Sequence, residues 1–285
     1  MAFPSPTKNY HTTSYPDIDP TSARLSTKGK NVVITGGGSG IGGDTTLAFA
    51  KSGASNIALL GRTEKTLLET KKRLATQYSG TAISTYAADL VDKQSLERAL
   101  ATIHSSFGTI DVLVANAGYL PTLQSIADTD LDEWYNGFEV NVKGNFNLIR
   151  AFLPHAAEDA AVINISTGIV HLPFLKGYSG YHTSKLASAK MFDYLHKEHP
   201  NLFVLNVHPG VIVTAMNDKT KDSGTVLPFD DVDLPASFVV WAVSPEARFL
   251  NGRFVWAHWD VNELKGMAKD IESSDKFTLG LLGWP

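Results

Sequence analysis

Short runs of apolar, mostly β-branched or leucine residues alternate along the chain with longer segments whose apolar residues recur every three or four positions. The short runs predict buried strands, and the longer spacing predicts amphipathic helices. Strands are expected at residues 31–35, 56–60, 82–88, 111–115, 161–166, 202–208 and 253–257, and helices at 44–51, 63–78, 94–107, 131–153 and 181–196. This order predicts a single-domain α/β fold: a doubly wound, Rossmann-type parallel sheet of seven strands with helices on both faces.

Three segments lie outside that alternation. Residues 1–27 are rich in proline, and we expect an irregular N-terminal extension before the main domain at 28–259. Residues 211–234 are mostly polar, and a loop of this length in a compact domain is typical of a lid. Residues 260–285 carry Leu279, Leu281 and Trp284, so we expect this tail to pack on the body or on a partner subunit.

Composition and charge exclude several classes of protein. Hydrophobic residues make up 43% of the 285 positions and charged residues 19%, which indicates a globular protein rather than a disordered one. The net charge of −4 argues against nucleic acid or an anionic membrane surface as a partner. With no cysteine, disulfides and thiolate chemistry are excluded. Neither a spanning helix nor a signal-peptide core is evident, so we expect a cytoplasmic protein.

No metal site is expected. The nine histidines show no zinc-type spacing, because His196 and His199 lie three apart but are followed at once by Pro200. No third ligand is evident near them.

The first expected strand runs into a glycine-rich loop, Thr-Gly-Gly-Gly-Ser-Gly-Ile-Gly at residues 35–42, which opens a helix. Glycine permits a tight turn and a close approach of backbone to a pyrophosphate, whose charge the helix N-terminus stabilises. Such a loop could be a simple turn, but the strand before it, the helix after it and Arg62 twenty residues past Gly42 favour a dinucleotide site. The expected contacts are Gly36, Gly38, Ser39, Gly40, Ile41 and Gly42.

This loop and three later motifs resemble the short-chain dehydrogenase/reductase family. The later motifs are Asn116-Ala117-Gly118, Tyr181-x-x-x-Lys185 and the Pro209-Gly210 element that ends at Thr214. They occur in the family's order over roughly residues 28–257, and the segment Phe-Val-Trp-Ala-His-Trp-Asp at 254–260 is similar to fungal members. The resemblance implies an NAD(P)-dependent oxidoreductase that assembles as a homodimer or homotetramer through its fourth and fifth crossover helices.

Arg62 favours NADP(H) over NAD(H). A carboxylate at the end of the second strand would bind the ribose hydroxyls and repel a 2′-phosphate, whereas a guanidinium can bind that phosphate. The alternative is that Arg62 is an ordinary surface residue, and Ser39 stands where NADP-preferring relatives often carry a second basic residue. NAD is therefore kept as the less favoured cofactor.

The resemblance also implies further cofactor contacts. Asp89, with Leu90, matches the position that binds adenine, although Asp89 could instead cap the next helix. Thr214 would bind the nicotinamide carboxamide. The other implied contacts are Asn116, Ala117, Gly118, Pro209, Gly210 and Ile212.

Tyr181 and Lys185 are the candidate proton-transfer pair. They lie one helical turn apart and so on one helix face, where an ammonium should lower the pKa of the phenol toward the working range. An ordinary amphipathic helix can also contain this spacing. Lys185 would in addition reach the nicotinamide ribose, and by resemblance Asn141 completes a catalytic tetrad by holding a helix kink and a water.

A hydroxyl at the end of the fifth expected strand should bind the substrate oxygen as charge develops on it. Two candidates stand there, Ser166 and Thr167. The family's strand ending aligns its catalytic serine with Thr167, which we favour, while Ser166 stays an alternative.

The substrate loops predict a mostly apolar and aromatic pocket. The residues expected to line it are Leu120, His171, Phe174, Tyr178 and Met216. This wall suits a medium-sized hydrophobic ketone or secondary alcohol, such as a polyketide, terpenoid or aromatic metabolite. Two alternatives are an epimerase or dehydratase with retained nucleotide, and a catalytically silent nucleotide-binding sensor or scaffold protein; the presence of both Tyr181 and Lys185 favours a working enzyme.

Overall fold

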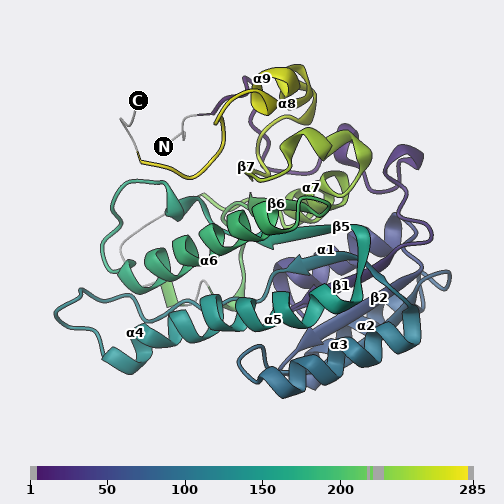
Figure 1. Cartoon of the computed structure of the whole chain (residues 1–285), viewed down its shortest axis with the longest axis horizontal. Coiled ribbons are helices and arrows are strands. Elements are labelled where there is room, and N and C mark those ends of the chain that lie inside the picture. The colour runs from purple at the N-terminus through teal and green to yellow at the C-terminus, as the bar shows by residue number, and fades with distance from the viewer. Residues whose placement is uncertain (1–4, 217–218, 221–227, 282–285) are drawn as a thin grey trace.

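The computed structural model describes residues 5–216, 219–220 and 228–281 (Figure 1). Within these residues seven strands form one parallel sheet in the order β3-β2-β1-β4-β5-β6-β7. The strands are β1 (Asn31–Thr35), β2 (Asn56–Gly61), β3 (Ala82–Ala87), β4 (Ile110–Ala115), β5 (Ala156–Ile165), β6 (Phe203–His208) and β7 (Arg253–Trp256). The predicted single-domain, doubly wound α/β fold is confirmed.

Helices cover both faces of the sheet. One face carries α1 (Gly40–Lys51), α2 (Glu64–Ala75) and α7 (Asp233–Ala242), and the other carries α3 (Lys93–Phe107), α5 (Asn145–Phe152) and α6 (Ser179–Glu198). Val32 and Ile34 point to the first layer and Val33 to the second, and all three are fully buried. This two-sided burial explains why the strands appear as continuous apolar runs.

The strand order opens a crevice at one edge of the sheet. From β1 the chain winds outward through β2 to β3, then returns to β4 on the other side of β1 and continues to β7. The loops after β1 and β4 therefore diverge at the carboxyl ends of the strands, where ligands bind in such sheets.

The expected helix at 131–153 is interrupted. α4 (Leu131–Phe138) leads into a π-helical segment, η3 (Glu139–Gly144), before α5 begins. In the wider turn, Asn145 Nδ2 donates to the Asn141 carbonyl oxygen at 2.8 Å, which satisfies a backbone acceptor from a side chain. Hydrophobic spacing does not distinguish this local widening from a regular helix.

The sequence predicted no helix beyond residue 196, yet the structure has α7, α8 (Val261–Gly266) and α9 (Ala268–Glu272). Residues 234–242 of α7 are all buried, so this helix has no polar face and no amphipathic period to detect. The last two residues of the expected lid loop belong to α7. Residues 217–218 and 221–227 of that loop lie outside the described residues. None of the described helices is long and apolar enough to cross a bilayer.

The N-terminal segment packs against α7 and α8 through its first 3-10 turn, and the C-terminal tail packs against β7. The N-terminal segment contains two short 3-10 turns, in which Ile18 and Leu25 are fully buried. In the tail, the Phe277 carbonyl oxygen accepts from Phe254 N at 2.7 Å. The tail's Trp284 lies outside the described residues.

Candidate active site

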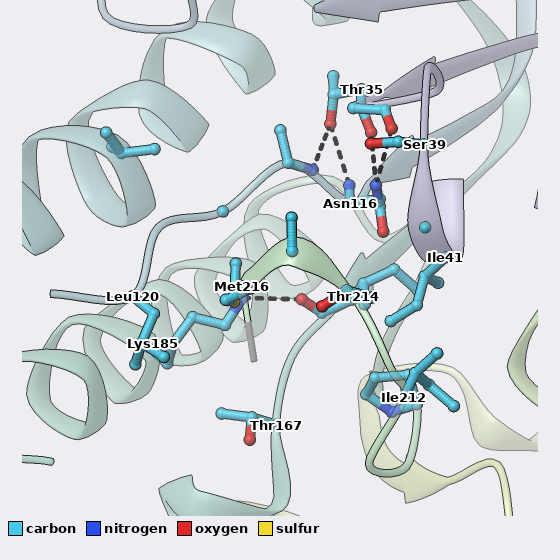
Figure 2. Close-up of a pocket in the computed structure, with 18 of the residues that line it drawn as sticks. Thr35, Ser39, Ile41, Asn116, Leu120, Thr167, Lys185, Ile212, Thr214 and Met216 are labelled. Atoms are coloured by element: carbon cyan, nitrogen blue, oxygen red, sulfur yellow. Dashed lines mark hydrogen bonds between the residues drawn. The ribbon is translucent and has the colours of Figure 1, made fainter. Parts of the chain in front are cut away.

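A cavity of about 760 Å³ lies at the carboxyl edge of the sheet (Figure 2). Residues that follow β1, β2 and β3 line one part of it, and residues that follow β4, β5 and β6 line the other. Every predicted cofactor and catalytic residue except Gly42 and Asn141 contributes to this lining. The structure therefore brings the sequence motifs together in one site.

The loop after β1 needs its glycines. Gly36 and Gly40 have φ of +66° and +51°, which side chains other than glycine rarely adopt. A Cβ on Gly42 would lie 2.3 Å from the Gly36 carbonyl oxygen, and one on Gly38 would lie 2.7 Å from Thr66 Oγ1. Ser39, the residue before α1, makes no side-chain hydrogen bond to the helix, so its hydroxyl does not occupy the first backbone amides of α1. This arrangement fits a pyrophosphate.

Asn116 ties the end of β4 to the end of β1. The backbone amides of Asn116 and Ala117 both donate to Thr35 Oγ1 at 3.0 Å, and Asn116 Nδ2 donates to the Thr35 carbonyl oxygen at 2.9 Å (Figure 2). A Cβ on Gly36 would lie 2.8 Å from Asn116 Nδ2. The Asn116 side chain thus fixes the backbone that lines the cavity next to the glycine loop.

Arg62 and Asp89 line the cavity beyond the glycine loop. Arg62 is exposed directly after β2. Asp89 Oδ1 accepts from Val91 N at 3.0 Å, whereas Asp92 is the residue that caps α3, through Ser95 N at 3.0 Å. Capping of α3, the alternative role for Asp89, is therefore taken by another residue.

Tyr181 and Lys185 project from the first turns of α6 into the cavity wall. Desolvation, together with the nearby Tyr178, raises the pKa of Tyr181 to about 12, although a hydrogen bond with Thr167 opposes the shift. Lys185 is buried, and desolvation lowers its pKa to about 8. Its Nζ donates to the Ile165 carbonyl oxygen at 2.8 Å (Figure 2).

The predicted acidification of Tyr181 by Lys185 is not met in this structure. The charge of Lys185 is not among the causes that shift the pKa of Tyr181, and the net shift is upward. Desolvation penalises both charged forms, the phenolate and the ammonium, and outweighs their proximity along the helix.

The two candidate hydroxyls after β5 have different surroundings. Thr167 bonds the Tyr181 side chain, and its Oγ1 also accepts from Ile169 N at 3.4 Å. Ser166 Oγ is buried and has no hydrogen-bond partner within the described residues. Both residues line the cavity, but only Thr167 shares a hydrogen bond with the phenol.

Asn141 lies fully buried in the π-helical segment η3. Its Oδ1 accepts from Tyr119 N and its Nδ2 donates to the Tyr119 carbonyl oxygen, both at 2.8 Å, and Nδ2 also donates to Ser184 Oγ at 3.0 Å. A Cβ on Gly118 would lie 3.4 Å from Asn141 Oδ1 and 3.9 Å from Lys185 Nζ. Asn141 therefore joins the loop after β4 to α6 and shares a small space with Lys185.

Three of the five predicted pocket residues, Leu120, Tyr178 and Met216, line the cavity. The other two lie outside this lining. His171 accepts from Trp256 Nε1 at 2.9 Å after the 3-10 turn η5 (Gly168–Val170), and Phe174 is 85% exposed. Spacing along a loop does not fix which side chains turn inward.

Several lining residues were not predicted. Most of them are apolar, and this apolar character in the loops expected to form the pocket is the sequence signal that could have identified them. His208, at the end of β6, carries no such signal. Burial and the nearby His258 and His171 lower the pKa of His208 well below its usual value. The additional lining residues on this side include Val140, Ile169, Leu172, Leu175, His208, Val213 and Phe229.

Lys219, a described residue of the expected lid, contacts the loop after β4 and α4. Its Nζ donates to the Leu120 carbonyl oxygen at 2.9 Å and to Tyr119 Oη at 3.1 Å, and lies 3.4 Å from Glu133 Oε1. Desolvation would raise the pKa of Glu133, but hydrogen bonds from Tyr119 and Thr122 outweigh it and hold the pKa at about 2. A described part of the expected lid thus contacts the loop after β4.

A glycine loop, a half-buried tyrosine and a buried lysine around one cavity are the features of a nucleotide-dependent oxidoreductase. The family model described as short chain dehydrogenase matches residues 30–224. The chain is 32% identical over 286 residues to a "Short chain dehydrogenase/reductase" of Claviceps purpurea (strain 20.1), covering 99% of this chain and 96% of the relative. It is 35% identical over 282 residues to "Short chain dehydrogenase pigC" of Monascus ruber, covering 95% and 91%. The chain belongs to the short-chain dehydrogenase/reductase family, with fungal relatives, as predicted.

Solved structures agree with this assignment. A short chain dehydrogenase from Burkholderia cenocepacia J2315, solved in complex with NADP, is similar with a TM-score of 0.71 and 26% sequence identity. The match covers 83% of this chain and 99% of that one.

Proposed function

We propose that the protein is an NADP(H)-dependent oxidoreductase that interconverts a ketone and a secondary alcohol on a medium-sized hydrophobic metabolite. The observation that carries the proposal is that the glycine loop, Thr167, Tyr181 and Lys185 line one cavity. A nicotinamide cofactor, when bound, supplies or accepts the hydride. The protein must bind it, orient the substrate and exchange the proton.

The cofactor would lie along the loops after β1, β2 and β3. The first turn of α1 and the glycine loop would hold the pyrophosphate, and Asp89 with Leu90 the adenine. Arg62 supports NADP(H), because the only carboxylate among the described lining residues is Asp89, which follows a different strand. The similar protein from Burkholderia cenocepacia binds NADP, which favours the same choice.

Tyr181 would act as the general acid in the reducing direction. Because its pKa is raised to about 12, its hydroxyl stays protonated near neutral pH and has a proton to give to a carbonyl oxygen. Thr167 would donate a second hydrogen bond to that oxygen, and Lys185 would bind the nicotinamide ribose. In the oxidising direction the same hydroxyl must first lose its proton, so oxidation should accelerate toward alkaline pH.

The wall of the cavity supports an uncharged, apolar substrate. Leu120, Leu172, Leu175, Val213 and Met216 line it. The charged residues among the described lining are Arg62, Asp89 and Lys185, each already assigned to the cofactor or to proton transfer. No described cation is left there for a substrate phosphate or carboxylate.

A binding and turnover experiment tests the proposal. Calorimetry with NADP(H) and NAD(H) should give tighter binding of NADP(H), and Arg62→Ala should weaken NADP(H) by about tenfold or more while changing NAD(H) little. A panel of apolar ketones should then yield net NADPH oxidation. Tighter NAD(H) binding would refute the cofactor choice, and nucleotide binding without turnover of any ketone would favour the sensor instead.

We also propose assembly into a homodimer or homotetramer through the fourth and fifth crossover helices, which are α4 with α5, and α6. Leu131, Tyr135 and Phe146 are exposed on these helices. Aromatic side chains exposed together on adjoining helices are typical of a protein interface.

A further inference from the structure

Three consecutive residues of the cavity wall, 210–212, follow β6. Gly210 has a φ of +98°. Asp230 bonds both backbone polar groups of Val211: Val211 N donates to Asp230 Oδ2 at 2.8 Å, and Asp230 N donates to the Val211 carbonyl oxygen at 2.9 Å. Ile212 forms a parallel bridge with Asp230. The position of this part of the wall therefore depends on Asp230.

Asp230 is itself held by His258. Asp230 Oδ2 and His258 Nε2 lie 2.9 Å apart, and their side chains are only 6% and 3% exposed. A Cβ on Gly210 would lie 2.6 Å from Asp230 Oδ2 and 3.1 Å from His258 Nε2. The pair thus packs directly against the Gly210 backbone, and only glycine leaves room for it.

The N-terminal segment covers this pair from outside. The Tyr10 ring stacks on the His258 ring, with centroids 4.5 Å apart and planes 14° from parallel. His11 N donates to the His258 carbonyl oxygen and Asp231 N donates to the Thr12 carbonyl oxygen, both at 2.9 Å. Residues 10–12 therefore connect the chain around Asp230 with the chain around His258.

The Asp230 carboxylate also acts on Tyr10 through space. Burial, and then the charge of Asp230, raise the pKa of Tyr10 above its usual value. The Tyr10 hydroxyl therefore stays protonated at moderately alkaline pH as well, and the ring stacked on His258 remains neutral.

We propose that Asp230 and His258 are positioning residues for nucleotide binding, and that residues 10–12 belong to the active-site architecture because they hold this pair against the Gly210 backbone. The inference rests on the proposed nucleotide-dependent function. A flexible glycine segment must be ordered when a ligand binds, and a support that orders it beforehand lowers that entropic cost. Loss of the support should therefore weaken binding rather than abolish proton transfer.

The test is calorimetric binding of NADP(H) to the full-length protein. Asp230→Ala should weaken binding by about tenfold, and Tyr10→Ala by about threefold or more, whereas Tyr10→Phe, which keeps the stacked ring, should bind within about twofold of the parent protein. In steady-state kinetics Asp230→Ala should raise the nucleotide KM more than it lowers kcat. Tyr10→Ala carries the test if Asp230→Ala does not fold.

Arg24→Ala is the matched control. Arg24 holds the same N-terminal segment to Glu246 at 2.6 Å, but neither residue lines the cavity. This variant should lose stability and keep its affinity for NADP(H). Unchanged affinity in both Tyr10→Ala and any folded Asp230→Ala, or an equal loss in Arg24→Ala, would overturn the inference. Failure of the parent protein to bind any nucleotide would instead refute the proposed function.

Discussion

Burial rather than a neighbouring charge sets the protonation of the two central side chains. The sequence placed Tyr181 and Lys185 on one helix face, and the structure puts both in the cavity wall. The direction of the pKa shift of Tyr181 was not predictable, because it depends on the side chains of other elements that enclose the hydroxyl. The Tyr181 hydroxyl is therefore protonated near neutral pH, which is the form that reduction needs.

Tyr181→Phe should lower kcat for ketone reduction by about 10²–10⁴, because it removes the proton donor and little else. Affinity for NADP(H), measured by calorimetry, should stay within about twofold. Tyr194→Phe, at an exposed position of the same helix, is the control and should leave kcat unchanged. Reduction at the parent rate in Tyr181→Phe would contradict the assigned role.

Thr167→Val should lower kcat more than Ser166→Ala. Thr167 shares a hydrogen bond with Tyr181, whereas Ser166 Oγ is buried without a partner in the described part of the chain. A lost hydrogen bond to developing charge typically costs about 10²–10³ in kcat. Full activity in Thr167→Val together with an inactive Ser166→Ala would reverse the assignment.

Lys185→Met should be inactive and yet more stable near neutral pH. Since the pKa of Lys185 falls to about 8 on folding, the unfolded chain binds more protons above that pH, and the free energy of unfolding should rise with pH until the ordinary lysine pKa is reached. Below about pH 8 the buried charge costs up to about 3 kcal/mol, partly offset by about 1 kcal/mol from the hydrogen bond to Ile165.

Urea unfolding at about pH 7 and about pH 9.5 checks this linkage. The stability advantage of Lys185→Met over the parent should be largest at the lower pH and shrink at the higher one. Lys190→Met, at an exposed position on the same helix, should show no such trend. A Met variant less stable than the parent at both pH values would contradict the shift.

At the scale of elements, the glycine loop is where sequence and geometry agree best. Gly42→Ala should weaken NADP(H) binding strongly or prevent folding, because its Cβ would lie 2.3 Å from the Gly36 carbonyl oxygen. Gly43→Ala is the control: its nearest neighbour would be 3.8 Å away, and alanine in a helix should stabilise by about 0.5–1 kcal/mol. Thermal melts and calorimetry compare the two, and equal effects would contradict the close approach.

The sequence predicted the elements whose hydrophobic pattern along the chain matches their burial in the fold. The strands gave clear apolar runs because helices cover both faces of the sheet. α7 was missed because burial on all sides leaves no amphipathic period, and η3 because side chains such as Asn145 complete its widened turn. His171 was misplaced because its direction depends on Trp256, 85 positions later in the chain.

At the scale of the whole molecule, the exposed aromatic side chains on α4 and α5 predict an oligomer. Light scattering should give at least a dimer, and Tyr135→Glu with Phe146→Glu should shift it toward monomer, because two charges cannot be desolvated in an apolar contact. Leu68→Glu, exposed on α2 on the opposite face of the sheet, should leave the mass unchanged. A monomeric parent protein would contradict the prediction.

The attachment of the N-terminal segment has a consequence for biosynthesis. Lys8 N and Asn9 N bond the Glu263 carboxylate across 255 and 254 positions of the chain. A ribosome makes the first partner long before the second, and contacts this distant in sequence form late. The glycine loop is complete early in translation, whereas the wall at residues 210–212 gains its support only when nearly the entire polypeptide has emerged, so a nascent chain should acquire nucleotide affinity as one of its last folding events.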